Sequence, residues 1–213
     1  MNRYRFKIFF IVIFLFCILM VYAVDNLKDI ISEYQSGKLS KAYQGIKSLI
    51  ERGDTRREVY IYAGIIYSDF GENTEALSIL FNGLQKYPED KTILKIIGRN
   101  YIRAGKYIES VAILKRLVKK GGGDYRVFEY LGDGYAGMGH LKDAIKNYQK
   151  SLKKNEREPW VYIKMGRLYK RLLLFSDAEE CFKRALVISR EDKRSTLEKS
   201  AIFELNLLKK ERK

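Results

Sequence analysis

The feature that most constrains the fold of this chain is a glycine that recurs every 34 residues. The four copies are Gly64, Gly98, Gly132 and Gly166. A tyrosine follows three residues after each of them. A small residue stands twelve positions after each glycine, at Ala76, Ser110, Ala144 and Ala178, and a large one four positions further, at Leu80, Leu114, Tyr148 and Phe182. Self-similarity at such a period indicates units that stack on one another.

The spacing within one unit predicts two packed helices. Residues at i, i+3, i+4 and i+7 share one helical face, and in the first clear copy they are Tyr60, Ala63, Gly64 and Tyr67. The glycine removes a side chain where a second helix crosses. We expect the small residue twelve positions on to face it, so that the helix axes approach to roughly 8–10 Å. Glycine inside a helix costs roughly 1 kcal/mol relative to alanine, which close packing has to recover.

This pattern resembles the tetratricopeptide (TPR) repeat family, whose units are helix–turn–helix hairpins of this length. The resemblance covers four units, 57–90, 91–124, 125–158 and 159–192. Pro88 matches the terminal proline of the family, which the later copies lack. The turn position holds Gly71, Gly105, Gly139 and Leu173. The resemblance implies an all-α fold, a right-handed superhelical array of helix–turn–helix repeats.

The array is expected to extend at both ends. Residues 25–56 are interpreted as a degenerate repeat, with Ile30 and Glu33 where the glycine and the tyrosine would stand. Residues 193–213 are expected to form a capping helix and a basic tail. The apolar stripe predicted for this helix is Leu197, Ala201, Ile202, Leu205 and Leu208. A helix that docks a partner is the alternative.

Residues 1–24 have the features of a membrane-directed leader. Three bases in Met1–Lys7 precede an uncharged run, Ile8–Val24. Two interpretations stay open: a signal peptide cleaved after Ala23, or a retained membrane anchor. Either one, with the bases kept inside, sends the body outward. The expected location is the cell envelope, periplasmic or anchored to the inner membrane with the body outside the cytoplasm.

The net charge of +15 favours anionic partners over neutral ones, although a solvated lysine-rich surface would also explain it. The two cysteines form no disulfide framework. Nucleic acid is not expected as a partner, because export would remove the usual targets. A basic surface-binding module for anionic lipid or polyanion remains the alternative function.

No motif of catalysis or cofactor binding stands outside the repeat pattern. The glycines of Gly132–Gly137 satisfy G-x-G-x-x-G, but they lie inside a predicted helix rather than between a strand and a helix. His140 is the only histidine, so neither a metal site nor a nucleophile–base pair can be built around a second one. We therefore predict no cofactor, no metal and no enzymatic activity.

In the TPR family the first helices of the units line a concave groove that binds peptide segments of partners. The resemblance places on this groove the positions three before, one after and five after each repeated glycine. In units 91–124 to 159–192 these are Lys95, Arg99, Arg103, Glu129, Asp133, Gly137, Ile163, Arg167 and Arg171, with Trp160 and Lys170 beside them.

Two interpretations of this groove compete. Glu129 and Asp133 could neutralise the basic residues of neighbouring helices, with about 0–1 kcal/mol for each exposed pair. A mainly basic groove could instead capture an acidic or C-terminal peptide. Trp160 would either anchor a partner or pack between units. The function expected is a non-catalytic protein–protein interaction scaffold of the cell envelope.

Overall fold

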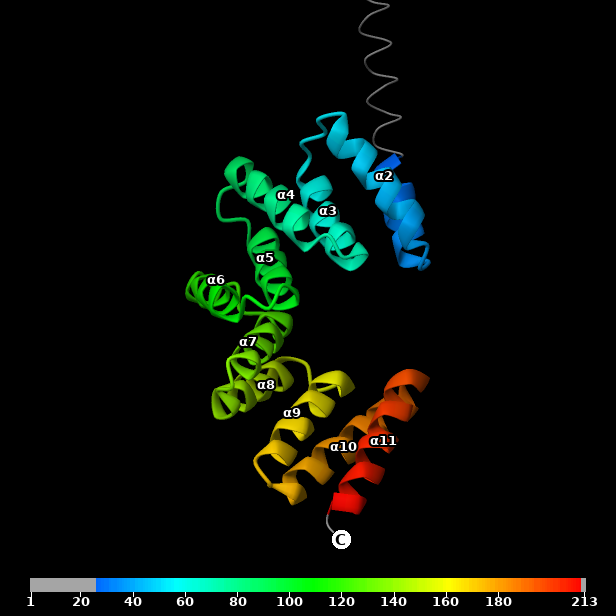
Figure 1. Ribbon diagram of the computed structural model, residues 1–213, viewed down its shortest axis with the longest axis vertical. Helices are drawn as coiled ribbons and strands as arrows, with labels where there is room; N and C mark the ends of the chain where they lie inside the picture. Colours follow the sequence, from blue (N-terminus) through cyan, green and yellow to red (C-terminus); the bar gives the residue numbers. More distant parts are fainter. Residues whose placement is uncertain (1–25, 212–213) are drawn as a thin grey trace, which may run out of the picture. The chain divides into compact units, whose positions relative to one another are not determined.

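The computed structural model describes residues 26–211, and all regular structure in this range is helical (Figure 1). The predicted all-α class of helix–turn–helix repeats is confirmed. The chain divides into two compact units, Met1–Ile96 and Ile97–Lys213. The division falls inside one helix, α5, so each unit is described by itself.

The first unit holds a helix over residues 26–35 and three complete helices after it. They are α2 (Leu39–Glu51), α3 (Arg57–Phe70) and α4 (Asn73–Lys86), followed by the first half of α5 (Lys91–Arg103). The second unit holds the rest of α5 and six further helices. They are α6 (Tyr107–Lys119), α7 (Tyr125–Gly137), α8 (Leu141–Lys154), α9 (Pro159–Arg171), α10 (Phe175–Glu191) and α11 (Ser195–Glu211).

Each of the four ranges 57–90 to 159–192 contains two helices joined by a tight turn. The turn needs a left-handed residue at the first or second position after the first helix, and glycine supplies it at Gly71, with φ of 109°. The repeat 159–192 has no glycine in its turn, and Leu173 adopts φ of 60° there. A positive φ is uncommon for a leucine, so this turn carries backbone strain that its equivalents avoid.

Each repeated glycine makes room for a large side chain of the next helix. A Cβ atom on Gly166 would lie 2.6 Å from the Phe182 ring, and one on Gly64 would lie 2.5 Å from Leu80. We expected the small residue twelve positions on to face the glycine, whereas the large residue sixteen positions on fills this space. The small residue lies beside the contact, where Ser110 Oγ donates a hydrogen bond to the Gly98 carbonyl at 2.8 Å.

The described part of the range predicted as a degenerate repeat, residues 26–56, has the same kind of fit with the two partners exchanged. Ile30, which replaces the expected glycine, is only 6% exposed. On α2, a Cβ atom at Gly45 would lie 2.6 Å from Ile30 Cγ1. The large side chain is thus on the first helix and the gap on the second, which explains why the helix pair forms without the motif.

The last helix, α11, packs against α9 and α10 (Figure 1). Ala201 and Leu208 are buried with Phe182 in one apolar cluster. The predicted stripe was wrong at Ile202, which is 37% exposed, whereas Glu204 is buried. The face of α11 that packs on its neighbours contains Leu197, Ala201, Glu204 and Leu208. Glu204 can be buried there because its carboxylate pairs with Arg167 of α9.

Substitution of Gly132 by alanine tests this packing. The added methyl group would meet the Tyr148 ring, so we expect Gly132→Ala to lower the free energy of unfolding by about 1–3 kcal/mol, although alanine is the better helix former. Urea denaturation followed by circular dichroism measures this change. In the Tyr148→Ala background the cost should largely disappear, and an equal cost in both backgrounds would refute the assigned contact.

Candidate functional site

A largely buried group of three charged side chains joins α7 to α9: the exposed fraction is 8% for Glu129, 17% for Lys164 and 18% for Asp133. The Lys164 ammonium lies 2.8 Å from Glu129 Oε1 and 2.8 Å from Asp133 Oδ2, and donates a hydrogen bond to each. Glu129 and Asp133 are one helical turn apart on α7, so one face of this helix presents both carboxylates. The Tyr148 hydroxyl of α8 donates a third hydrogen bond to Asp133, at 2.6 Å.

The electrostatics of this group follow from two carboxylates that share one ammonium away from water. Burial raises the pKa of Asp133, and the charge of Lys164 and the hydrogen bond from Tyr148 oppose this only in part. Burial alone would lower the pKa of Lys164, but the charges of Asp133 and Glu129 outweigh it and raise that pKa. Burial and the neighbouring Asp133 also raise the pKa of Tyr148.

A second ionic contact ties α9 to α11. Arg167 Nε donates to Glu204 Oε1 at 2.6 Å, and Glu204 is only 4% exposed. Lys170 Nζ lies 3.6 Å from the other oxygen of Glu204 and 3.4 Å from Glu211 Oε1. Burial of an unpaired carboxylate costs free energy, so Arg167 and Lys170 stabilise the packing of α11 on α9.

Trp160 stands at the start of α9 between the two ionic contacts. Lys164 Nζ lies 5.7 Å from the centroid of its ring, and Arg167 Cζ lies 5.4 Å from it. These distances are within the range of a cation–π contact. The ring packs partly on the apolar cluster of Phe182 and Ala201 and remains partly exposed. Trp160 therefore packs within its unit and also presents a surface.

The other residues predicted for the groove differ in exposure. Ile163 is fully buried in the apolar cluster beneath α11, so its assignment to an open surface was wrong. Arg103 and Arg171 are exposed, and Arg99 is half-buried in the same unit. Lys95 is half-buried in the first unit. A partner-binding role for the exposed members stays a prediction.

The expected neutralisation of Glu129 and Asp133 across helices is present, but its cation is Lys164, which was not among the residues predicted for the groove. A signal was available. Lys164 lies two residues before Gly166, a position that is aromatic or aliphatic in the other three units, at Tyr62, Ile96 and Tyr130. A lone charge in an apolar column next to two acids predicts a buried ion pair.

The glycines of the G-x-G-x-x-G stretch serve packing in this fold. A Cβ atom on Gly134 would lie 2.7 Å from Val111, and one on Gly137 would lie 2.5 Å from the Tyr107 ring, so α6 lies against α7 there. Within residues 26–211 no three His, Cys, Asp or Glu side chains are arranged to hold a metal ion. In the same range no helix is long and apolar enough to cross a membrane. The predicted leader lies outside the described residues.

No protein-family model and no curated relative matches this chain. Solved structures do match it. One is described as MamA 41-end from Desulfovibrio magneticus RS-1, with a TM-score of 0.65 and 19% identity, and the match covers 79% of this chain and 96% of that one. Another, MamA AMB-1, has a TM-score of 0.62 and 20% identity, with 78% and 98% covered. At this identity the likeness establishes the fold alone.

Replacement of Lys164 by methionine should strongly destabilise, at neutral pH, the compact unit that contains α6 to α11. The change leaves Glu129 and Asp133 buried without their cation, and breaking a buried pair in this way costs about 3–5 kcal/mol. The same change at Lys183, whose side chain is 65% exposed and pairs with Glu179 on α10, should cost under about 0.5 kcal/mol. Urea denaturation compares the two variants.

The destabilisation by Lys164→Met should also depend on pH. Burial already raises the folded-state pKa of Asp133, and without the charge of Lys164 that pKa rises further above its unfolded value. Such groups stabilise the fold below the unfolded pKa, and the contribution is lost as pH rises through the folded pKa. The difference from wild type should therefore shrink between pH 7 and pH 5, and a constant or growing difference would contradict a cluster of buried carboxylates.

Proposed function

We propose that this chain is a non-catalytic protein-interaction module with TPR-type repeats. A segment of a partner protein would bind to a surface centred on Trp160 of α9, the first helix of the repeat 159–192. The observation that carries this proposal is the partly exposed Trp160 ring with two cations, Lys164 and Arg167, held beside it. Tryptophan and arginine are the residues most often found to dominate binding energy at protein interfaces.

The cations of this face are positioned before any partner arrives. Glu129 and Asp133 hold Lys164, and Glu204 holds Arg167. Binding to side chains that are already ordered costs less conformational entropy than binding to mobile ones. Arg171 is exposed one turn beyond Arg167 and extends the basic surface. Arginine pairs with carboxylates through two parallel hydrogen bonds, which favours an acidic or C-terminal peptide as the ligand.

The polar groups of this face have structural rather than chemical roles in the proposal. The two buried carboxylates are engaged by Lys164 and Tyr148, and this arrangement orders the surface without a reacting group. We further propose that residues 1–24 direct the chain to the cell envelope, where the body meets its partner outside the cytoplasm. The support for this location is the basic and then uncharged pattern of the leader.

Co-purification from the native membrane tests the proposal. The full chain, carrying a C-terminal tag, is isolated after cross-linking, and each partner is quantified by mass spectrometry. The double variant Trp160→Ala/Arg171→Glu should reduce the recovered partner by about tenfold or more, because loss of an interface hot spot costs at least about 2 kcal/mol. A circular dichroism melt confirms that the variant is folded, since Trp160 also packs on its own unit.

The matched control is Lys183→Glu, an equal charge reversal at an exposed position of α10. Recovery of the partner should not change in this variant. Equal recovery with the Trp160 variant and wild type would refute the proposed face. If every association were lost at 0.5 M salt and none depended on Trp160, general adhesion to polyanions would be the better description.

A further inference from the structure

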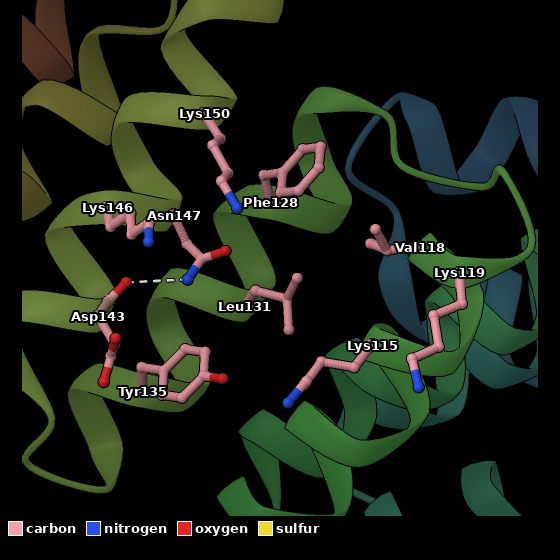
Figure 2. Close-up of a pocket in the computed structure, with 10 residues that line it drawn as sticks. All are labelled: Lys115, Val118, Lys119, Phe128, Leu131, Tyr135, Asp143, Lys146, Asn147 and Lys150. Carbon is pink, nitrogen blue, oxygen red and sulfur yellow. Dashed lines mark hydrogen bonds between the residues drawn. The ribbon is translucent and has the colours of Figure 1, made fainter.

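Two hollows occupy equivalent positions in the second unit, one repeat apart. The first has a volume of about 270 Å³ and is lined by α6, α7 and α8 (Figure 2). The second has a volume of about 280 Å³ and is lined by α9 and α10. Their floors match position by position over 34 residues: Phe128, Leu131 and Tyr135 in the first, and Tyr162, Met165 and Tyr169 in the second.

The rims of the two hollows differ in charge, although the backbone positions are the same. Lys146 and Lys150 of the first correspond to Glu180 and Arg184 of the second, and each rim also has one aspartate, Asp143 or Asp177. The first rim adds Lys115 and Lys119 from α6, so it combines four ammonium groups with one carboxylate. We name this hollow the lysine pocket and the second one the acidic pocket.

The acidic pocket has two carboxylates and one guanidinium on its rim. Cys181 adds no charge, because burial raises the pKa of its thiol to about 12. The lysine pocket and the acidic pocket therefore have similar apolar floors and rims of opposite net charge. This pair provides an internal comparison for what the charges of the lysine pocket do.

The cations of the lysine pocket lack the compensation that the chain provides elsewhere. Among the described residues, no carboxylate lies within ion-pair distance of its four lysines, whereas Lys164 on α9 contacts two carboxylates at 2.8 Å. Lys150 Nζ lies 5.7 Å from the centroid of the Phe128 ring. In Figure 2 the lysines of α6 and those of α8 flank the Phe128 and Leu131 side chains of α7.

We propose that the lysine pocket binds a segment of a partner protein in which one large apolar side chain is flanked by carboxylates. The apolar side chain would pack on the half-buried Val118 and Tyr135, next to the buried Phe128 and Leu131, and the carboxylates would pair with lysines of α6 and α8. The volume is slightly below the range of roughly 300–1,000 Å³ for small-molecule sites, and it suits a single side chain. The site shares no residue with the Trp160 face and goes beyond the function proposed above.

Charge complementarity and the apolar floor together favour a peptide over other anions. A lipid headgroup or a nucleic-acid backbone would pair with the lysines but would leave the half-buried Val118 and Tyr135 of the pocket uncovered. An acidic peptide with an aromatic residue uses both features, and its affinity should depend on each of them. This double dependence is what the experiment measures.

The probe is a fluorescein-labelled heptapeptide with a central phenylalanine and three acidic residues on each side. Fluorescence anisotropy at 0.15 M salt follows its titration with the purified full chain. We expect the double variant Lys146→Glu/Lys150→Glu to weaken binding by about tenfold or more. The same peptide with alanine in place of phenylalanine should bind wild type about tenfold more weakly, because burial of a phenylalanine side chain contributes about 1.5–3 kcal/mol.

The matched control is Lys142→Glu/Lys153→Glu, which makes the same charge change at two exposed lysines of α8 outside both pockets. This variant should lose less than about threefold in affinity. Conversely, Glu180→Lys converts the acidic pocket toward the lysine type and should add a second, weaker site for the peptide. Circular dichroism melts show that all variants are folded.

Three outcomes would overturn the proposal. Equal losses in the pocket variant and the α8 control would indicate general electrostatic adhesion. Equal affinity for the phenylalanine and alanine peptides would exclude a role for the floor. The third outcome concerns vesicles that contain 30% phosphatidylglycerol. If the wild-type chain sediments with them, Lys146→Glu/Lys150→Glu does not, and the peptide fails to bind, the lysines form a membrane-binding surface instead.

Discussion

The contact on which the repeats depend is the fit of one large side chain of a helix against the bare backbone of its neighbour. Leu80, Leu114, Tyr148 and Phe182 each occupy the space that a side chain at the repeated glycine would need. Because protein interiors tolerate neither overlap nor voids, this fit sets how the two helices of a repeat approach. The pair of Ile30 and Gly45 shows that the fit matters more than which helix supplies the glycine.

Residues that take no part in this glycine contact differ in chemistry from one repeat to the next. On α7 and α9 they form a largely buried ion group, in which Lys164 pairs with Glu129 and Asp133. On α8 and α10 they form two pockets with similar floors and opposite rims, where Lys146 corresponds to Glu180. A repeat array can thus change what its surfaces bind while its packing stays the same.

Much of the fold could be predicted from the sequence, and less of the candidate site. The paired helices follow from local spacing, and so do the turn glycines. Ile163 was assigned to a surface because column positions alone do not show that α11 covers it. Ile202 was placed in the buried stripe because a hydrophobicity pattern does not show that Glu204 is buried instead, paired with Arg167 of α9.

The sequence by itself determined the repeat length, the helical class and the positions where backbone must meet a large side chain, because these depend on residue size and helical period within one 34-residue repeat. Only the tertiary structure decided which charges compensate one another and which surround an apolar hollow. Lys164 meets residues 31 and 35 positions earlier in the chain, and the lysine pocket draws on three helices. Electrostatic energies depend on distance and burial, and neither is encoded in the spacing of residues along one helix.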